Sequence, residues 1–100
     1  MQIDFIDQNK LRRQIKSIIK SSLGPSYRVY FFGSRVKGNN LERSDIDIAI
    51  GGPQKVSASK RLDLQDQIDN LPYLYKFDIV DLNSMPKEFS QKIMINAEEF

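Results

Sequence analysis

The sequence predicts a single α+β domain over residues 1–100, with its elements in the order α-β-β-α-β-α. Three stretches carry apolar residues at helical spacing. Three shorter runs between them are rich in β-branched and aromatic residues, or alternate apolar with polar ones. Glycine or proline stands at several of the boundaries between these segments. A chain of 100 residues is long enough for one domain with one core.

The composition is that of an ordinary globular protein, but it limits the available chemistry. The chain is 40% hydrophobic and 28% charged, and its net charge of +2 gives only weak support for a polyanionic partner. It has no cysteine and no histidine, which excludes disulfides, thiolate zinc sites and imidazole acid/base catalysis. Any catalysis must therefore use carboxylates, Lys or Arg, hydroxyls and bound metal ions. No apolar run approaches the ~18 residues of a membrane span, so we expect a cytoplasmic protein.

The first helix is expected over residues 3–22. Apolar residues recur at helical spacing, and Gly24 and Pro25 end the segment; the apolar positions are Leu11, Ile15, Ile18 and Ile19. The same stretch carries five basic residues: Lys10, Arg12, Arg13, Lys16 and Lys20. Such residues could follow a phosphate backbone, but a solvated helix face is the more common explanation. No aromatic residues are interleaved for base stacking, which disfavours nucleic acid as the partner.

A candidate phosphate-binding turn follows the first predicted strand, residues 27–32. Gly33 allows the backbone to turn sharply and to approach a ligand closely, and Ser34 adds a hydroxyl beside freed N–H groups. Arg35 and Lys37 bring positive charge to the same place, where a helix N-terminus would also favour an anion. By itself a Gly-Ser pair after a strand is a weak signal, since most such pairs are plain turns.

The second predicted strand, residues 45–50, separates two chemistries onto its two faces. Side chains two residues apart share a face, so Asp45 and Asp47 point one way and the isoleucines between them point the other. Alternating strands often carry carboxylates on a solvated face, which is the plain explanation for the pair alone. Two carboxylates some ~6 to 7 Å apart would repel, and a Mg²⁺ ion suits the gap between them.

A second helix is expected over residues 57–71 and is followed by Pro72. Its apolar positions follow the spacing i, i+4, i+7: Leu64, Ile68 and Leu71. Its acidic residues are expected on the polar face, where they make the surface more soluble: Asp63, Asp66 and Asp69.

The third predicted strand, residues 77–82, contains two aspartates that face opposite ways by alternation. Asp78 lies among apolar neighbours, where an uncompensated carboxylate costs several kcal/mol, so it requires a partner such as a metal. Asp81 ends the strand, where solvent or an N-cap role would satisfy it. A third helix is then expected after Ser84 and Pro86. It is expected to follow these apolar positions: Phe89, Ile93, Ala97 and Phe100.

Carboxylates that converge from two strands can hold one or two Mg²⁺ ions against the phosphates of a nucleotide. The predicted set is Asp45, Asp47 and Asp78. Gly33, Ser34, Arg35 and Lys37 would grip the triphosphate. Asp78 is then the carboxylate best placed to accept the proton of an attacking hydroxyl.

The string Gly33-Ser34, ten residues, then Asp45-Ile46-Asp47, followed by Phe77-Asp78-Ile79-Val80, resembles the DNA polymerase β-type nucleotidyltransferase superfamily. It resembles in particular the minimal nucleotidyltransferase (MNT) branch. The resemblance implies a nucleotidyltransferase-like core: a small mixed β-sheet with helices packed on one face and the metal site on the other. It also implies that Gly33 and Ser34 bind the triphosphate of ATP. Asp45 and Asp47 would bind the metal, and Asp78 would be the third carboxylate.

Minimal members of this family resemble antitoxins that are encoded beside a helical HEPN partner, a ribonuclease-type toxin. The resemblance implies Mg²⁺-dependent transfer of AMP from ATP to a tyrosine hydroxyl of that partner.

Other hypotheses stay open. The chain could be a catalytically silent module that neutralises its partner by contact, or a small-molecule nucleotidyltransferase completed by a partner subunit. Tyr73 and Tyr75 are candidates for adenine stacking or for a partner surface, with ordinary packing as the plainer explanation. The sequence leaves the base preference, the number of metals and the oligomeric state open.

Overall fold

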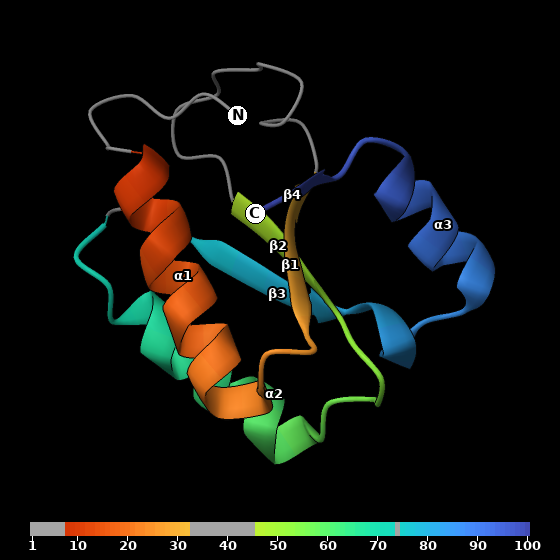
Figure 1. The fold of residues 1–100 in the computed structure, drawn as a ribbon, viewed down its shortest axis with the longest axis horizontal. Helices are drawn as coiled ribbons and strands as arrows, with labels where there is room; N and C mark the ends of the chain where they lie inside the picture. The colour runs from red at the N-terminus through yellow and green to blue at the C-terminus, as the bar shows by residue number, and fades with distance from the viewer. Residues whose placement is uncertain (1–7, 33–45, 74) are drawn as a thin grey trace.

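The computed structural model describes residues 8–32, 46–73 and 75–100. The predicted order α-β-β-α-β-α is confirmed among them, with one short strand added at the end (Figure 1). The helices are α1 (Gln8–Leu23), α2 (Ala58–Asp69), the short 3-10 helix η2 (Leu82–Ser84) and α3 (Lys87–Ile95). The strands are β1 (Arg28–Phe32), β2 (Ile46–Gly51), β3 (Phe77–Asp81) and β4 (Glu98–Glu99). None of these helices is long and apolar enough to cross a membrane.

The strands form one mixed sheet in the order β3-β2-β1-β4, which confirms the predicted mixed sheet. β1 pairs antiparallel with both β2 and β4, whereas β2 and β3 are parallel. Parallel neighbours need a crossover connection, and α2 supplies it between β2 and β3. β2 is therefore an inner strand with a hydrogen-bonded neighbour on each side.

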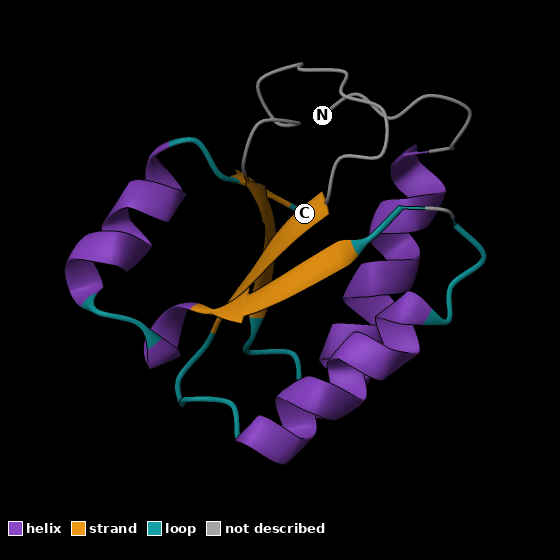
Figure 2. Ribbon diagram, turned by 180° about the vertical axis from the view of Figure 1, so that it is seen from behind, coloured by secondary structure: helices purple, strands orange, loops and turns teal. Residues whose placement is uncertain are grey.

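One face of the sheet is buried beneath α1 and α2 (Figure 2). Alternate residues of the strands supply its apolar side chains: Val29, Phe31, Ile46, Ile48, Ile50, Phe77 and Ile79. The predicted apolar positions of the helices meet them: Leu11, Ile15 and Ile19 from α1, and Leu64 and Ile68 from α2. Ser57 caps α2 by accepting a hydrogen bond from the Lys60 N–H at 3.2 Å, and the aspartates at positions 63, 66 and 69 are exposed as predicted.

The third helix differs from the prediction in its position and its length. α3 lies on the opposite side of the sheet from α1 and α2, and it contributes no buried residue (Figures 1 and 2). The prediction that the helices pack on one face of the sheet is therefore confirmed for α1 and α2. The prediction that helical spacing continues to Phe100 is wrong, because α3 ends at Ile95 and the chain then pairs with the edge of β1.

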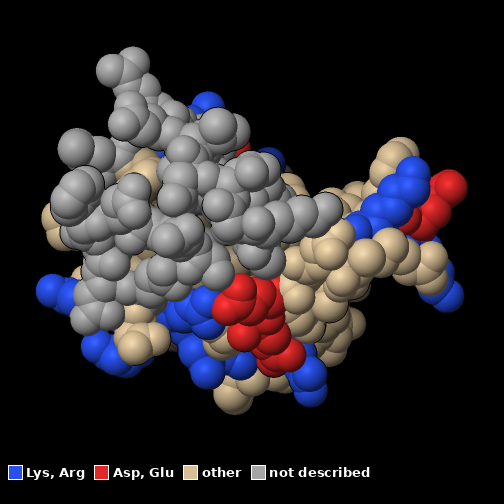
Figure 3. Space-filling model, turned by 90° about the horizontal axis from the view of Figure 1, so that it is seen from above, with Lys and Arg blue, Asp and Glu red and all other residues tan. Residues whose placement is uncertain are grey.

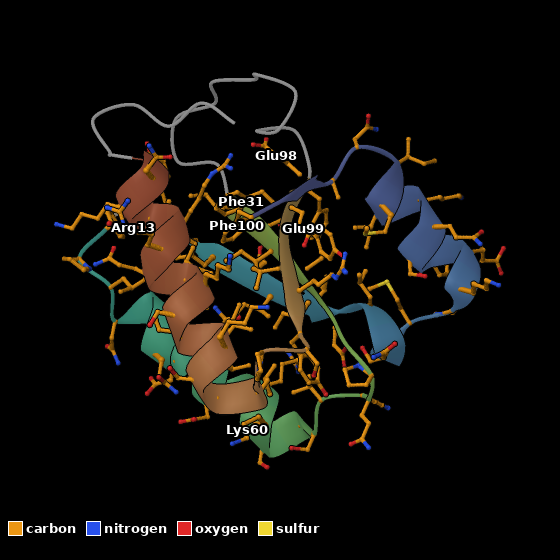
Figure 4. All side chains as sticks on the ribbon, viewed as in Figure 1. Arg13, Phe31, Lys60, Glu98, Glu99 and Phe100 are labelled. Carbon is orange, nitrogen blue, oxygen red and sulfur yellow. The ribbon has the colours of Figure 1, made fainter. Side chains whose placement is uncertain are left out.

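Long-range contacts explain this early end of α3. The Phe100 N–H donates to the Val29 carbonyl at 3.0 Å, and the Phe100 ring stacks on Phe31 with 4.1 Å between the ring centroids (Figure 4). A continued helix would leave the edge groups of β1 unpaired and both rings without this contact. The pairing of β4 with β1 provides hydrogen-bond partners for this edge and brings the two rings together.

Arg12 ties α1 to the new strand β4. Its guanidinium pairs with the Glu98 carboxylate and lies 5.5 Å from the centroid of the Phe31 ring and 5.8 Å from that of Phe100. On the opposite face of the sheet, the Arg28 guanidinium pairs with the Glu99 carboxylate at 3.6 Å. Seen from above, acidic side chains gather in a patch with Lys and Arg on both sides (Figure 3). The hydrogen bond and charge of Arg12 hold the pKa of Glu98 below its usual value of 4.5, although partial burial raises it.

Asp81 joins the end of β3 to the loop that precedes α2. It is only 2% exposed, and its Oδ2 accepts a hydrogen bond from the Val56 N–H at 2.7 Å. Its Oδ1 accepts from the Asn83 N–H at 3.0 Å and so caps η2. The predicted N-cap role is confirmed, whereas the alternative that solvent satisfies Asp81 is wrong, because the β2–α2 loop covers it.

Asp81→Ala is expected to lower the free energy of unfolding by about 2 kcal/mol or more, since two backbone N–H groups lose their acceptor. Urea unfolding followed by circular dichroism measures the change. Asp66→Ala, at an exposed position on α2, is the matched control and should stay within about 0.5 kcal/mol of the unchanged chain. Equal losses in the two variants would contradict this role for Asp81.

The Arg12–Glu98 pair is expected to make stability depend on pH. Because the folded pKa of Glu98 is depressed, its contribution is present at neutral pH. It is lost as the pH falls through 4.5 and then through the lower folded pKa. Glu98→Gln should therefore be less stable than the unchanged chain at pH 7, and the difference should shrink at acidic pH. A difference that does not change with pH would mean that the Glu98 charge contributes nothing.

Candidate active site

The face of the sheet that points away from α1 and α2, here called the open face, carries a row of three residues across three strands. Phe32 of β1 pairs with Asp47 of β2, and Asp47 pairs with Asp78 of β3. Residues paired in this way have side chains on the same face. The next row along the strands consists of Tyr30, Ala49 and Val80, with Glu99 of β4 beside Tyr30.

Asp47 and Asp78 are therefore direct neighbours, as the sequence predicted for this part of the site. Adjacent strands lie about 4.8 Å apart, which places the two carboxylates within reach of a single cation. Both side chains are half-buried, so their charges are less screened than they would be on an open surface. Two like charges at this separation repel, and a divalent cation would offset the repulsion.

The other predicted site residues lie outside the part of the chain that the structure describes: Gly33, Ser34, Arg35, Lys37 and Asp45. The described ends of their segment, Phe32 and Ile46, lie at the same end of the sheet as the aspartate row. Ile46 is fixed there by its N–H, which donates to the Lys76 carbonyl at 2.8 Å. The structure thus brings together Asp47 and Asp78 and leaves the remaining positions as predictions.

The chemistry of this pair fits a Mg²⁺ ion, which takes oxygen ligands, preferably carboxylates and waters. Within residues 8–32, 46–73 and 75–100, no group of three or more His, Cys, Asp or Glu residues could hold a metal. The described residues therefore supply two carboxylates of the predicted set. Asp81, the other aspartate of β3, faces the opposite way and binds backbone N–H groups instead.

The structure places two groups of residues whose roles the sequence left undecided, and both lie away from the aspartate row. Tyr73 and Tyr75 are half-buried against the core, and the Tyr73 hydroxyl donates to Gln14 of α1, which supports ordinary packing. Lys10 and Arg13 are exposed on α1, the helix that packs on the buried face of the sheet, and Figure 4 shows Arg13 on this helix. They line a surface cavity of about 480 Å³ that is separate from the open face.

Sequence reasoning missed the apolar residues that adjoin the aspartates on the open face. Tyr30 is 9% exposed, and its Cε1 would lie 3.6 Å from a Cβ added at Gly51. Ala49 is fully buried between Tyr30 and Val80 in the register. Alternation along β1 puts Tyr30 and Phe32 on one face, but only the pairing with β2 identifies that face as the one carrying Asp47.

The comparisons with known sequences agree on one family. The family described as Polymerase beta, Nucleotidyltransferase matches residues 13–100. A curated relative from Haemophilus influenzae, named "Probable protein adenylyltransferase MntA", is 30% identical over 79 residues, which cover 79% of this chain and 68% of the relative.

Solved structures share the fold at lower identity. A chain of a toxin–antitoxin structure with AMP-PNP has a TM-score of 0.75 and 24% identity, with 88% of this chain and 70% of that chain covered. A chain from the complex of tri-AMPylated Shewanella oneidensis HEPN toxin with MNT antitoxin has a TM-score of 0.72 and 21% identity, covering 93% and 71%. A protein described as a minimal nucleotidyltransferase has a TM-score of 0.61 and 19% identity, covering 96% and 98%. These likenesses show a nucleotidyltransferase-like fold.

Proposed function

The chain belongs to the polymerase beta nucleotidyltransferase family, and on that premise we propose that it transfers AMP from ATP to a hydroxyl of a HEPN-type toxin and thereby acts as an antitoxin. The observation that carries the proposal is the in-register pair Asp47 and Asp78 on the open face. Relatives add support. One is named a protein adenylyltransferase, and others were solved with AMP-PNP or beside an AMPylated HEPN toxin.

Asp47, together with Asp45 and Asp78, would hold one or two Mg²⁺ ions. The bound metal would supply charge neutralisation at the phosphate oxygens of ATP. Asp47 is well placed for this role because it lies on the inner strand β2, whose buried isoleucines fix its direction. A ligand on a rigid strand loses little conformational freedom when it binds.

The residues after β1 would hold the other end of the nucleotide. Gly33 and Ser34 would offer backbone N–H groups to the triphosphate, and Arg35 and Lys37 would add positive charge. Since Phe32 and Ile46 flank this segment at the aspartate end of the sheet, the triphosphate would lie beside the metal ligands. The α-phosphorus would then face the acceptor.

Asp78 is proposed as the base. It would accept the proton of the acceptor hydroxyl while the hydroxyl oxygen attacks the α-phosphorus. The bond from that phosphorus to the bridging oxygen would break, and pyrophosphate would leave in line with the attack. We propose a tyrosine as the acceptor, and the use of ATP implies a reaction in the cytoplasm.

Asp47→Asn and Asp78→Asn are each expected to lower AMP transfer by about 100-fold or more, because they remove a metal ligand and the proposed base. The assay incubates the chain with labelled ATP and a HEPN-type toxin, and mass spectrometry locates AMP on the acceptor residue. Asp66→Asn on α2 is the matched control and should transfer at the unchanged rate. Full transfer by both site variants would contradict the proposed chemistry.

Mg²⁺ together with AMP-PNP is expected to raise the thermal midpoint of the unchanged chain. Ligand at a hundredfold excess over its Kd adds about 2.7 kcal/mol to the stability of a folded protein. Asp47→Asn should lose most of the Mg²⁺-dependent part of this shift while keeping its circular dichroism spectrum. An equal Mg²⁺-dependent shift in Asp47→Asn would show that the metal binds elsewhere.

A further inference from the structure

The N-terminal half of α1 has a concave surface that lies apart from the aspartate row. A cavity of about 480 Å³ is lined there by five residues of α1 and by Leu71, which follows α2. Four of the six lining side chains can donate hydrogen bonds, and the other two are apolar. The α1 residues have the spacing i, i+3, i+4, i+7, i+8 and therefore share one face of the helix: Lys10, Arg13, Gln14, Ser17 and Ile18.

The cavity lining is positively charged and includes no acidic residue. α1 carries five basic residues and no Asp or Glu. Two of the five are used within the fold, because Arg12 pairs with Glu98 and the Lys20 ammonium donates to two backbone carbonyls. In the described part of the chain, the Arg13 guanidinium forms no ion pair. The charge of Arg13 is therefore available to an anion in the cavity.

The aspartates of the neighbouring helix do not enter the cavity. α2 packs beside α1 and carries three of them. Asp63 accepts a hydrogen bond from Gln67, and Asp69 accepts one from Gln65, each at 3.0 Å. Both carboxylates are thus held along their own helix, and none of the three aspartates lines the cavity.

Gln14 is a donor that the fold already holds in place. Its side chain is half-buried, and its Oε1 accepts a hydrogen bond from the Tyr73 hydroxyl. Among the described residues, its Nε2 has no hydrogen-bond partner. A side chain that is already ordered loses little entropy when it binds a ligand. With an ammonium and a guanidinium beside it, this amide suits a phosphate group, whose oxygens accept several charge-assisted hydrogen bonds.

We propose that this cavity binds the phosphate group of a small ligand. The two basic side chains offset its charge, and Gln14 and Ser17 donate hydrogen bonds to its oxygens. The organic part of a phosphate ester packs on Ile18 and Leu71. A small ligand is favoured over a nucleic acid, because the lining has no aromatic side chain on which bases could stack. The proposal does not depend on the proposed function.

The test is a titration of the isotope-labelled full chain, followed by NMR at constant ionic strength. EDTA removes divalent cations, so that metal-dependent binding at the aspartates does not contribute. The probes are inorganic phosphate, AMP and a short single-stranded RNA. The side-chain N–H signals of Arg13 and Gln14 report on the cavity.

Two variants change the cavity and one serves as the control. Arg13→Ala removes an exposed charge, and Gln14→Glu places a carboxylate in the cavity while keeping an acceptor for Tyr73. Lys60→Ala is the matched control, because it removes an equal exposed charge from α2, at the opposite end of the helical layer from Arg13 (Figure 4).

Inorganic phosphate is expected to shift the Arg13 and Gln14 signals saturably, with half-saturation on the order of 1 mM. Arg13→Ala and Gln14→Glu should each raise the half-saturation concentration about tenfold or more, whereas Lys60→Ala should change it by less than about twofold. Tighter binding of AMP than of inorganic phosphate would identify the ligand as a phosphate ester. Equal binding would identify it as free phosphate.

The proposal is overturned if the shifts do not saturate or if chloride produces them equally, because the cavity then attracts only a diffuse layer of anions. It is also overturned if Arg13→Ala binds phosphate at full strength, or if Lys60→Ala weakens binding as much as Arg13→Ala does. Binding of the RNA without saturable binding of phosphate would make this face a nucleic-acid surface instead. Asp47→Asn should leave all these results unchanged, so the cavity and the proposed catalysis can fail independently.

Discussion

The alternation of β2 is the constraint on which the rest of the structure depends. Ile46, Ile48 and Ile50 are each at most 1% exposed beneath α1 and α2, which fixes the opposite direction for Asp47. A slip of one residue would expose the isoleucines and bury the aspartate, at a cost far larger than the energy of any surface contact. The parallel register with β3 then places Asp78 directly beside Asp47. Core packing thereby determines the geometry of the candidate site.

Much of this could be predicted from the sequence because the relevant signals are local. Periodicity gave the helices, and alternation gave the opposite directions of Asp78 and Asp81. The end of α3 could not be predicted in this way, because the continued helical spacing up to Phe100 competes with a distant strand edge and with the ring of Phe31. The burial of Asp81 depends on the Val56 N–H, which alternation along one strand does not reveal. Gly33, Ser34, Arg35, Lys37 and Asp45 remain predictions.

The two faces of the sheet have different roles. The side under α1 and α2 supplies stability, and α1 is joined to the C-terminal strand by the Arg12–Glu98 pair. The open face carries the in-register carboxylates Asp47 and Asp78, which suit a metal and phosphates. A protein that neutralised its partner only by contact would not need this pair of carboxylates. The in-register carboxylates are therefore the feature that favours an enzyme over a binding module.

The most direct test of this account is the position of a divalent cation in crystals of the chain grown with AMP-PNP and Mn²⁺, located by anomalous scattering. The account predicts a Mn²⁺ peak between strands β2 and β3, with carboxylate oxygens of Asp47 and Asp78 as ligands and the nucleotide phosphates beside it. A nucleotide bound elsewhere, or a Mn²⁺ ion that neither aspartate touches, would contradict it.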